Sequence, residues 1–236
     1  MNIKQHIRIA TLGTTALLAA SASAGMTGRA LEDCYAWEGE DFGGASVSGW
    51  VCDLYLEFDS AEDILLNIYD FNDIKSGNVY HQGVTAAGWA PNEQGSIFTT
   101  EVSQSFDSFI AIGGVTEYGP DGRPYQMAGN GVGVDPNFGG LSAAGPGENA
   151  GWYNGNPNNP HGQAQESDSG YFLVFIGRFA KLDSDGFSMA GSYGSATFNQ
   201  GIGTEPTQSG FVVVPAPGAL ALLGIAGLTG GRRRRN

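Results

Sequence analysis

The feature that most constrains the fold is a two-residue alternation of apolar and polar side chains, which is typical of half-buried β-strands. In WVCDLYLEFD (residues 50–59) the even positions are apolar or cysteine, and three of the five odd positions are acidic. Similar alternation occurs in DILLNIYD (63–70) and FDSFIAIGG (106–114), while 171–182 is apolar on both faces. Gly and Asp separate these stretches, and no 3.6-residue period is sustained between the two ends. The sequence therefore predicts one all-β domain over residues 25–210, an antiparallel β-sandwich or jelly roll.

The charge of the chain excludes one large class of partners. The sequence has 24 Asp and Glu against 11 Lys and Arg, a net charge of −13, and only five of the basic residues lie between residues 25 and 210. Such a field repels phosphate backbones and anionic headgroups, so we expect no nucleic-acid binding. The same charge attracts divalent cations or simply keeps the protein soluble, and both readings stay open.

Residues 1–24 predict a secretory signal peptide. Lys4 and Arg8 give a basic start, a weakly apolar stretch follows, and Ala22 and Ala24 form a small-residue site for signal peptidase, with cleavage after Ala24. The alternative is an amphipathic first helix of the domain. Export is the favoured interpretation, because the apolar run is short and is followed by glycine.

Two cysteines, Cys34 and Cys52, lie in the exported part. In an oxidising compartment the simplest expectation for an even pair at short spacing is a disulfide. It would stabilise the fold by roughly 3 kcal/mol on a chain-entropy argument. A metal or redox pair is the weaker alternative, since neither a CxxC spacing nor a nearby histidine is present.

The C-terminal residues 211–236 have a three-part order. A proline-marked hinge, Pro215-Ala216-Pro217, precedes the uncharged stretch 218–231, and a cluster of four arginines follows. The uncharged stretch would span about 21 Å as a helix, against about 30 Å for a bilayer core. It is therefore marginal as a permanent anchor and adequate for transient insertion, with the arginines on the cytoplasmic side. The cluster consists of Arg232, Arg233, Arg234 and Arg235.

This order resembles the PEP-CTERM sorting signal of envelope proteins, whose tail is removed by an exosortase. The match covers about the last 23 residues and departs at Ala216, where the family usually has glutamate; such variants are similar to those of planctomycete-type proteins. The resemblance implies an exosortase-like processing enzyme as a partner and a place in the cell envelope or outside the cell. A plain tail anchor is the alternative. Parts of the body, such as DLYLEF and LLNIYDF, also resemble an uncharacterised domain found ahead of such tails, which implies no activity.

Residues 118–165 are rich in Gly, Asn and Pro, and are functional, disordered or contain short strands. Within them AGWYNGNPNNPHG holds Trp152, Tyr153, Asn154 and Asn156. Aromatic faces stack on sugar rings and amides bond to hydroxyls, so these four residues are the candidate carbohydrate site. The alternative is a loop that anchors itself by burying Trp152.

The other tryptophans divide into two groups. Trp37 and Trp89 are further possible platforms for a sugar, whereas Trp50 falls on the apolar face of its strand and is expected in the core.

No catalytic residue is predicted. His81 and His161 lie in polar segments where exposure accounts for them, and no GxSxG or HExxH motif accompanies them. Glu57 and Asp59 share one face of a predicted strand, a spacing that suits a glycoside hydrolase but arises often by chance in acidic chains.

A weak calcium candidate lies in LDSDGFS, where Asp183 and Asp185 resemble the opening of a calcium loop. The third acid and the closing glutamate of such a loop are missing, so a plain turn is the stronger interpretation. No other cofactor is expected.

Together these features predict an exported, non-catalytic envelope or extracellular-matrix protein, structural or carbohydrate-binding, with an extracellular polysaccharide as the expected partner. A calcium-dependent adhesive domain is the alternative, and a secreted glycoside hydrolase is a weaker one.

Overall fold

The structure, a computed structural model, describes residues 25–40, 46–73, 79–81, 89, 106–118, 124–127, 132–135, 146–155, 160–184 and 186–217. This part of the chain is all-β and contains no helical element, which confirms the predicted fold class. The strands are β1 (Met26–Glu40), β2 (Ser46–Phe58), β3 (Asp63–Asn72), β4 (Phe109–Ile110), β5 (Val115–Tyr118), β6 (Pro124–Met127), β7 (Val132–Val134), β8 (Ala150–Asn154), β9 (Gln165–Glu166), β10 (Phe172–Leu182), β11 (Tyr193–Gln200) and β12 (Thr207–Pro215).

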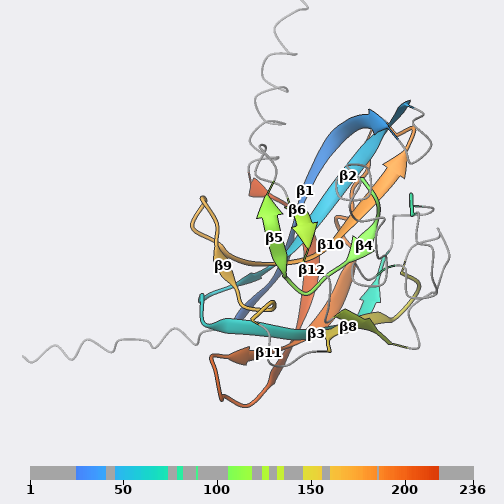
Figure 1. Cartoon of the computed structure of the whole chain (residues 1–236). Helices are drawn as coiled ribbons and strands as arrows, with labels where there is room; N and C mark the ends of the chain where they lie inside the picture. Colours follow the sequence, from blue (N-terminus) through green and yellow to red (C-terminus); the bar gives the residue numbers. More distant parts are fainter. Residues whose placement is uncertain are drawn as a thin grey trace, which may run out of the picture.

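Ten of these strands form one nearly closed mixed sheet, and β5 and β6 form a separate two-stranded sheet. The strand order is β4-β10-β2-β1-β12-β11-β3-β8-β7, with β9 beside β10. Figure 1 shows β1, β2 and β10 running side by side, with β3, β8 and β11 crossing below them. The expected sandwich of two antiparallel sheets therefore differs from the observed sheet, which bends back on itself. Irregular pairings at Phe175/Gly177 in β10 and Ile68/Phe71 in β3 provide such bends.

One strand pair also departs from the antiparallel expectation. β1 and β12 are parallel, with Arg29 opposite Val212 and Glu32 opposite Pro215. A parallel pair needs a long connection between its strands, and here the whole intervening sheet supplies it. β12 thus continues to Pro215, five residues beyond the predicted end of the domain at residue 210.

The inner side of the sheet holds one large apolar core. Phe71 is central to it, with ring contacts to Trp152, Phe179 and Phe211 at centroid distances of 5.4, 6.3 and 6.4 Å. The inward residues of β2 are those that the alternation predicts: Cys52, Leu54, Leu56 and Phe58.

The predicted disulfide is present. Cys34 of β1 lies directly opposite Cys52 of β2, and the two are bonded. Export to an oxidising compartment would suit such a bond.

Residues 111–113 and 161–164 narrow the gap between the two ends of the sheet. Ala111 and Gly113 donate backbone hydrogen bonds to β10, and the backbone of Leu65 in β3 donates to Gly162. The two segments touch where Gly113 (φ +59°) faces His161, since a Cβ on Gly113 would collide with the His161 carbonyl oxygen. Only glycine fits this position.

Residues 118–165 contain short strands, one of the alternatives left open by their composition. β6, β7 and β8 all lie in this range, and β8 joins the main sheet beside β3.

Candidate functional site

The structure places Trp152, the central residue of the predicted carbohydrate site, in the core. Trp152 is 1% exposed, its Nε1 donates to the carbonyl oxygen of Ala111 at 2.8 Å, and its ring meets Phe71 edge-on. Neither ring face is free to stack on a sugar. The loop is instead anchored by burying its tryptophan, as the alternative interpretation held.

Of the other three members of the predicted site, the structure describes Tyr153 and Asn154. Tyr153 is 45% exposed, and its ring covers Gly133 of the neighbouring β7, where a Cβ would collide with it. Asn154 ends β8, and Asn156 lies outside the described residues. Tyr153 therefore remains as an exposed aromatic residue on β8, between β3 and β7.

The remaining tryptophans are used in packing. Trp37 is half-buried and stacks on Phe106 at 4.6 Å, and the buried Trp89 stacks on His81 at 4.4 Å, so the expected platforms are occupied. Trp50 is partly buried and packs against the main core.

His81 is buried, which corrects the expected solvent exposure. Its side chain is 2% exposed, and its Nδ1 lies 2.8 Å from the carbonyl oxygen of Ser108 and 3.6 Å from Asp107 Oδ1. The residues on either side of His81 in sequence are polar, but the chain folds its ring beneath Trp89.

The two acidic candidates do not form the sites that the sequence suggests. Glu57 is buried and bonded to Arg29 at 2.6 Å, whereas Asp59 is exposed, so they are not a free carboxylate pair. Asp183 is exposed after β10, and Ser184 bonds to the carbonyl oxygen of Gly186 as in a turn. Asp185 lies outside the described residues.

Among the residues with described positions, one group of three possible metal-ligand residues occurs, Glu32 with Cys34 and Cys52. The two sulfurs are bonded to each other, and Glu32 accepts hydrogen bonds from Ser188 Oγ and the Met189 amide at 2.7 and 2.6 Å. Glu32 therefore holds the segment before β11 against β1, and this group is structural.

Polar and aromatic side chains form regular rows on the outward face of β1, β2 and β10. Because a strand's side chains alternate, residues opposite one another in the register form rows across the three strands. The rows are Leu173 with Glu57, Leu31 with Tyr55 and Phe175, Asp33 with Asp53 and Arg178, and Tyr35 with Val51 and Ala180.

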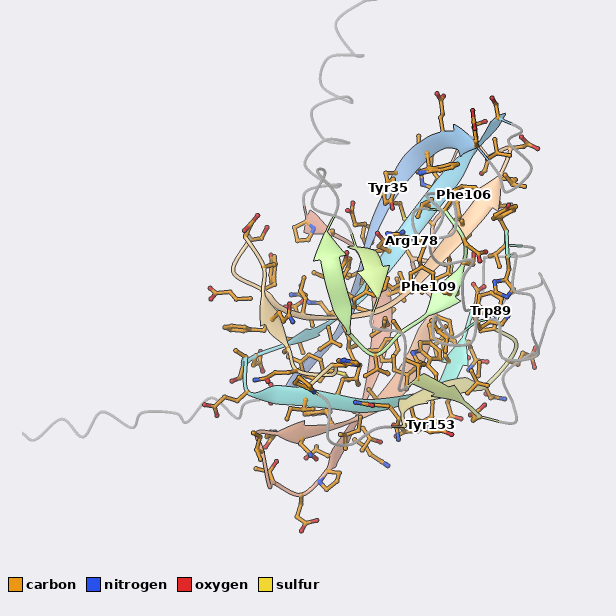
Figure 2. All side chains as sticks on the ribbon, viewed as in Figure 1. Tyr35, Trp89, Phe106, Phe109, Tyr153 and Arg178 are labelled. Carbon is orange, nitrogen blue, oxygen red and sulfur yellow. A yellow bond between two sulfur atoms is a disulfide. The ribbon has the colours of Figure 1, made fainter. Side chains whose placement is uncertain are left out.

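Asp53 and Arg178 form a buried, two-pronged ion pair in this face. Arg178 Nε and Nη2 donate to the two carboxylate oxygens of Asp53 at 2.6 and 2.8 Å, and Tyr35 Oη donates to Asp53 at 3.3 Å. The guanidinium also lies 5.7 Å from the centre of the Phe109 ring. Figure 2 shows Tyr35, Arg178 and Phe109 gathered over these strands, with Tyr153 well apart.

The ion pair keeps Arg178 charged. Burial is the largest single influence and lowers the pKa of Arg178, but the charge of Asp53, its hydrogen bonds and the nearby Tyr35 and Tyr55 together outweigh burial, so the net pKa is raised. The two side chains are thus both charged and hydrogen-bonded to each other, and we assign the pair a structural role next to the neighbouring rows.

Beside this pair, an open cleft of about 860 Å³ lies over the Leu31–Tyr55–Phe175 row. Its floor includes Tyr55, tilted against Phe175 at a centroid distance of 5.4 Å. Its rim is formed by residues from three distant parts of the chain, within 113–115, 161–171 and 216–217, and β1, β2 and β10 supply the rest of the lining.

The rim is held by local hydrogen bonds. The Ser167 amide donates to the Tyr171 carbonyl oxygen at 2.7 Å, and Ser167 Oγ accepts from the Tyr171 amide at 3.1 Å. β9 pairs with β10 on one side of this turn. Tyr171 is therefore presented at the cleft by a closed turn.

The cleft combines aromatic rings with groups that bond to hydroxyls. Tyr55 and Tyr171 supply rings, and every ordinarily charged lining residue is acidic, namely Asp33, Glu166 and Asp168. Its volume lies in the usual range for small-molecule sites, and its composition suits a neutral, hydroxyl-rich ligand better than an anionic one. The further polar lining residues are His161, Gln163, Gln165, Ser167 and Ser169.

Sequence reasoning missed this cleft because no local stretch contains it. The one local signal is ESDSGYF, residues 166–172, in which a Gly-containing turn places Tyr171 among acidic and hydroxyl side chains. His161, one of the histidines considered as a possible catalytic group, also lines the cleft.

The processing residues fall partly on the described chain. Pro215 ends β12, the Ala216 amide donates to the Glu32 carbonyl oxygen at 3.0 Å, and Pro217 lines the cleft. Residues 1–24, with Ala22 and Ala24, and residues 218–236, with the four arginines, lie outside the described residues. In the part of the chain that is described, no helix has the length and apolar character needed to cross a membrane.

Comparison with known proteins gives no relative: no family model, curated protein or solved structure matches this chain.

Proposed function

We propose that this protein is an exported, non-catalytic module of the cell envelope or extracellular matrix that binds a neutral polysaccharide in the cleft over Tyr55. The observation that carries the proposal is the cleft itself, where two tyrosines, two glutamines and three carboxylates meet in a space of about 860 Å³. Lys and Arg are absent from its described lining, which disfavours acidic polysaccharides.

The route to that location follows from the two ends of the sequence. In this proposal residues 1–24 direct export, and the tail of Pro215-Ala216-Pro217, the uncharged segment and the arginines directs PEP-CTERM-type sorting by an exosortase-like enzyme. The disulfide is consistent with an oxidising destination. Mass spectrometry of the protein from an exporting host tests this: we expect an N-terminus at Gly25 and loss of residues C-terminal to the hinge, whereas intact ends contradict it.

Binding is tested by the retention of the purified full chain on insoluble polysaccharides, neutral and acidic, with reducing-sugar release measured in parallel. We expect retention on a neutral polysaccharide and no release of sugar. Tyr171→Ala removes a cleft ring, and loss of about 1 kcal/mol of stacking weakens binding roughly fivefold.

Tyr153→Ala is the matched control, because it removes an exposed tyrosine that is outside the cleft. Its retention should equal that of the unchanged protein. Loss of retention in Tyr153→Ala alone would move the site to β8, and sugar release by the unchanged protein would make the protein a glycoside hydrolase.

A further inference from the structure

The turn between β2 and β3 concentrates negative charge around one buried carboxylate. It carries Asp59, Glu62 and Asp63 within five residues. Asp59 and Glu62 are exposed, whereas Asp63, the first residue of β3, is 0% exposed. Within the described structure none of the three forms a salt bridge.

Asp63 is the least satisfied group of this turn. Neither of its carboxylate oxygens has a hydrogen bond of standard geometry, although both are buried. Burial raises the pKa of Asp63, the nearby Ser60 amide partly offsets this, and the charges of Asp59 and Glu62 raise the pKa further. A buried carboxylate with no positively charged partner and no hydrogen bond of standard geometry is unfavourable and rare in folded proteins.

Hydrogen bonds fix the backbone around Asp63, which holds this residue in its buried position. The Asp59 amide donates to the Gly25 carbonyl oxygen at 2.8 Å, and the Ala164 amide donates to the Asp63 carbonyl oxygen at 2.9 Å. Gln163 Nε2 donates to the Ala61 carbonyl oxygen at 3.1 Å, and the Glu62 amide bonds to Ser60 Oγ at 3.1 Å. These donors are therefore engaged elsewhere, and the Ser60 amide is the donor that acts on the Asp63 carboxylate.

We propose that this turn binds a divalent cation. Asp63 is the inner ligand, and the exposed side chains of Asp59 and Glu62 turn in to join the coordination shell and balance the charge of the cation. A cation supplies the Asp63 carboxylate with a positively charged partner, in addition to the weak contact with the Ser60 amide. It also converts the mutual repulsion of three carboxylates into attraction.

Calcium is the ion that this chemistry favours. The available ligands are all oxygens, without the nitrogen or sulfur that zinc or copper prefers. Calcium accepts an irregular shell of six to eight oxygens, including water, whereas magnesium requires a near-ideal octahedron. This site is distinct from the Asp183–Asp185 turn and from the cleft, and it does not depend on the proposed carbohydrate binding.

The test is thermal unfolding of the full chain in EDTA and in rising calcium chloride, with magnesium chloride as the comparison. We expect calcium to raise the Tm by roughly 5–10 °C at a hundredfold excess over its Kd, and magnesium to raise it less. Asp63→Asn should remove the calcium response, and Glu62→Gln should shift it to higher calcium concentration.

Asp183→Asn is the matched control, because it neutralises an exposed acid in a different turn and should keep the full response. A Tm that calcium leaves unchanged overturns the proposal. So does a response that survives Asp63→Asn, or one that Asp183→Asn removes. Should Asp63→Asn fail to fold, the direct calcium affinity of Glu62→Gln decides: an unchanged affinity is evidence against the site, and a weakened one supports it.

Discussion

The two faces of β2 are both buried, but by opposite means. The inward face carries Cys52 and a run of apolar side chains that fill the main core. The outward face carries Asp53 and Glu57, which are buried and paired with arginines from β10 and β1. Alternation therefore predicts correctly which side chains share a face, whereas burial of the polar face depends on partners across the sheet.

The two faces of β2 should therefore respond differently when a side chain is removed by mutation. An apolar side chain that is lost leaves a cavity, which the surroundings partly refill. A charge that loses its partner remains buried and unpaired, and this is the more severe defect.

The largest effect should come from breaking the outward ion pair. Arg178→Met leaves Asp53 buried without its partner, so we expect a loss of about 4 kcal/mol in the free energy of unfolding, measured by urea denaturation. The double variant Asp53→Leu with Arg178→Met should recover most of the loss, because no charge is then stranded. If the single change cost under about 1 kcal/mol, the two faces would not differ in the way described.

On the inward face, Leu54→Ala should cost about 3 kcal/mol by leaving a cavity in the main core. Leu54 is fully buried, and urea denaturation again gives the measurement. Leu66→Ala, at a half-buried position of β3, is the control and should cost clearly less. Equal losses at both positions would mean that the inward face has no well-packed interior.

The disulfide joins the two strands of the same hairpin, and its loss should have a smaller effect. Cys34→Ala with Cys52→Ala should lower the free energy of unfolding by about 2 kcal/mol, the lower end of the usual range because the strands are already paired in register on both sides of the bond. The Tm of the unchanged protein with and without reductant provides an independent check. A reductant-insensitive Tm would show that the bond contributes nothing.

The smallest effect concerns pH and Asp63, which has a raised pKa and no arginine beside it. In EDTA the folded chain keeps the Asp63 proton to a higher pH than the unfolded chain, whose pKa lies near the ordinary 3.8. Stability is therefore lost as pH rises from that value through the raised pKa. Asp63→Asn should remove this part of the pH dependence and raise the Tm at neutral pH by a few degrees. Identical Tm profiles for the two proteins from acid to neutral pH would contradict it.

Local patterns in the sequence predict the all-β class, the inward side chains of β2 and the disulfide. These patterns fail where the burial of a residue depends on segments that are distant in the sequence. Trp152 lies in a polar stretch, but β8 pairs with β3 and brings its indole to Ala111. His81 has polar neighbours in sequence, and it is buried because Trp89 and Ser108 enclose it.

The cleft was beyond sequence reasoning for the same physical reason. Tyr55 and Tyr171 are 116 positions apart in the numbering, and they meet because β10 lies against β2 in a register that only the closed sheet defines. The parallel pairing of β1 with β12 was equally hidden, because alternation gives the face of a strand and not its neighbour or direction.

The position of β12 has a consequence for how the protein is made. It lies between β1 and β11, so the last strand of the described chain joins the two halves of the sheet. Until residues 207–215 emerge, the chain holds two separate half-sheets, β4-β10-β2-β1 and β11-β3-β8-β7, each with an open edge that invites aggregation. The complete strand order therefore cannot form before residues 207–215 are available.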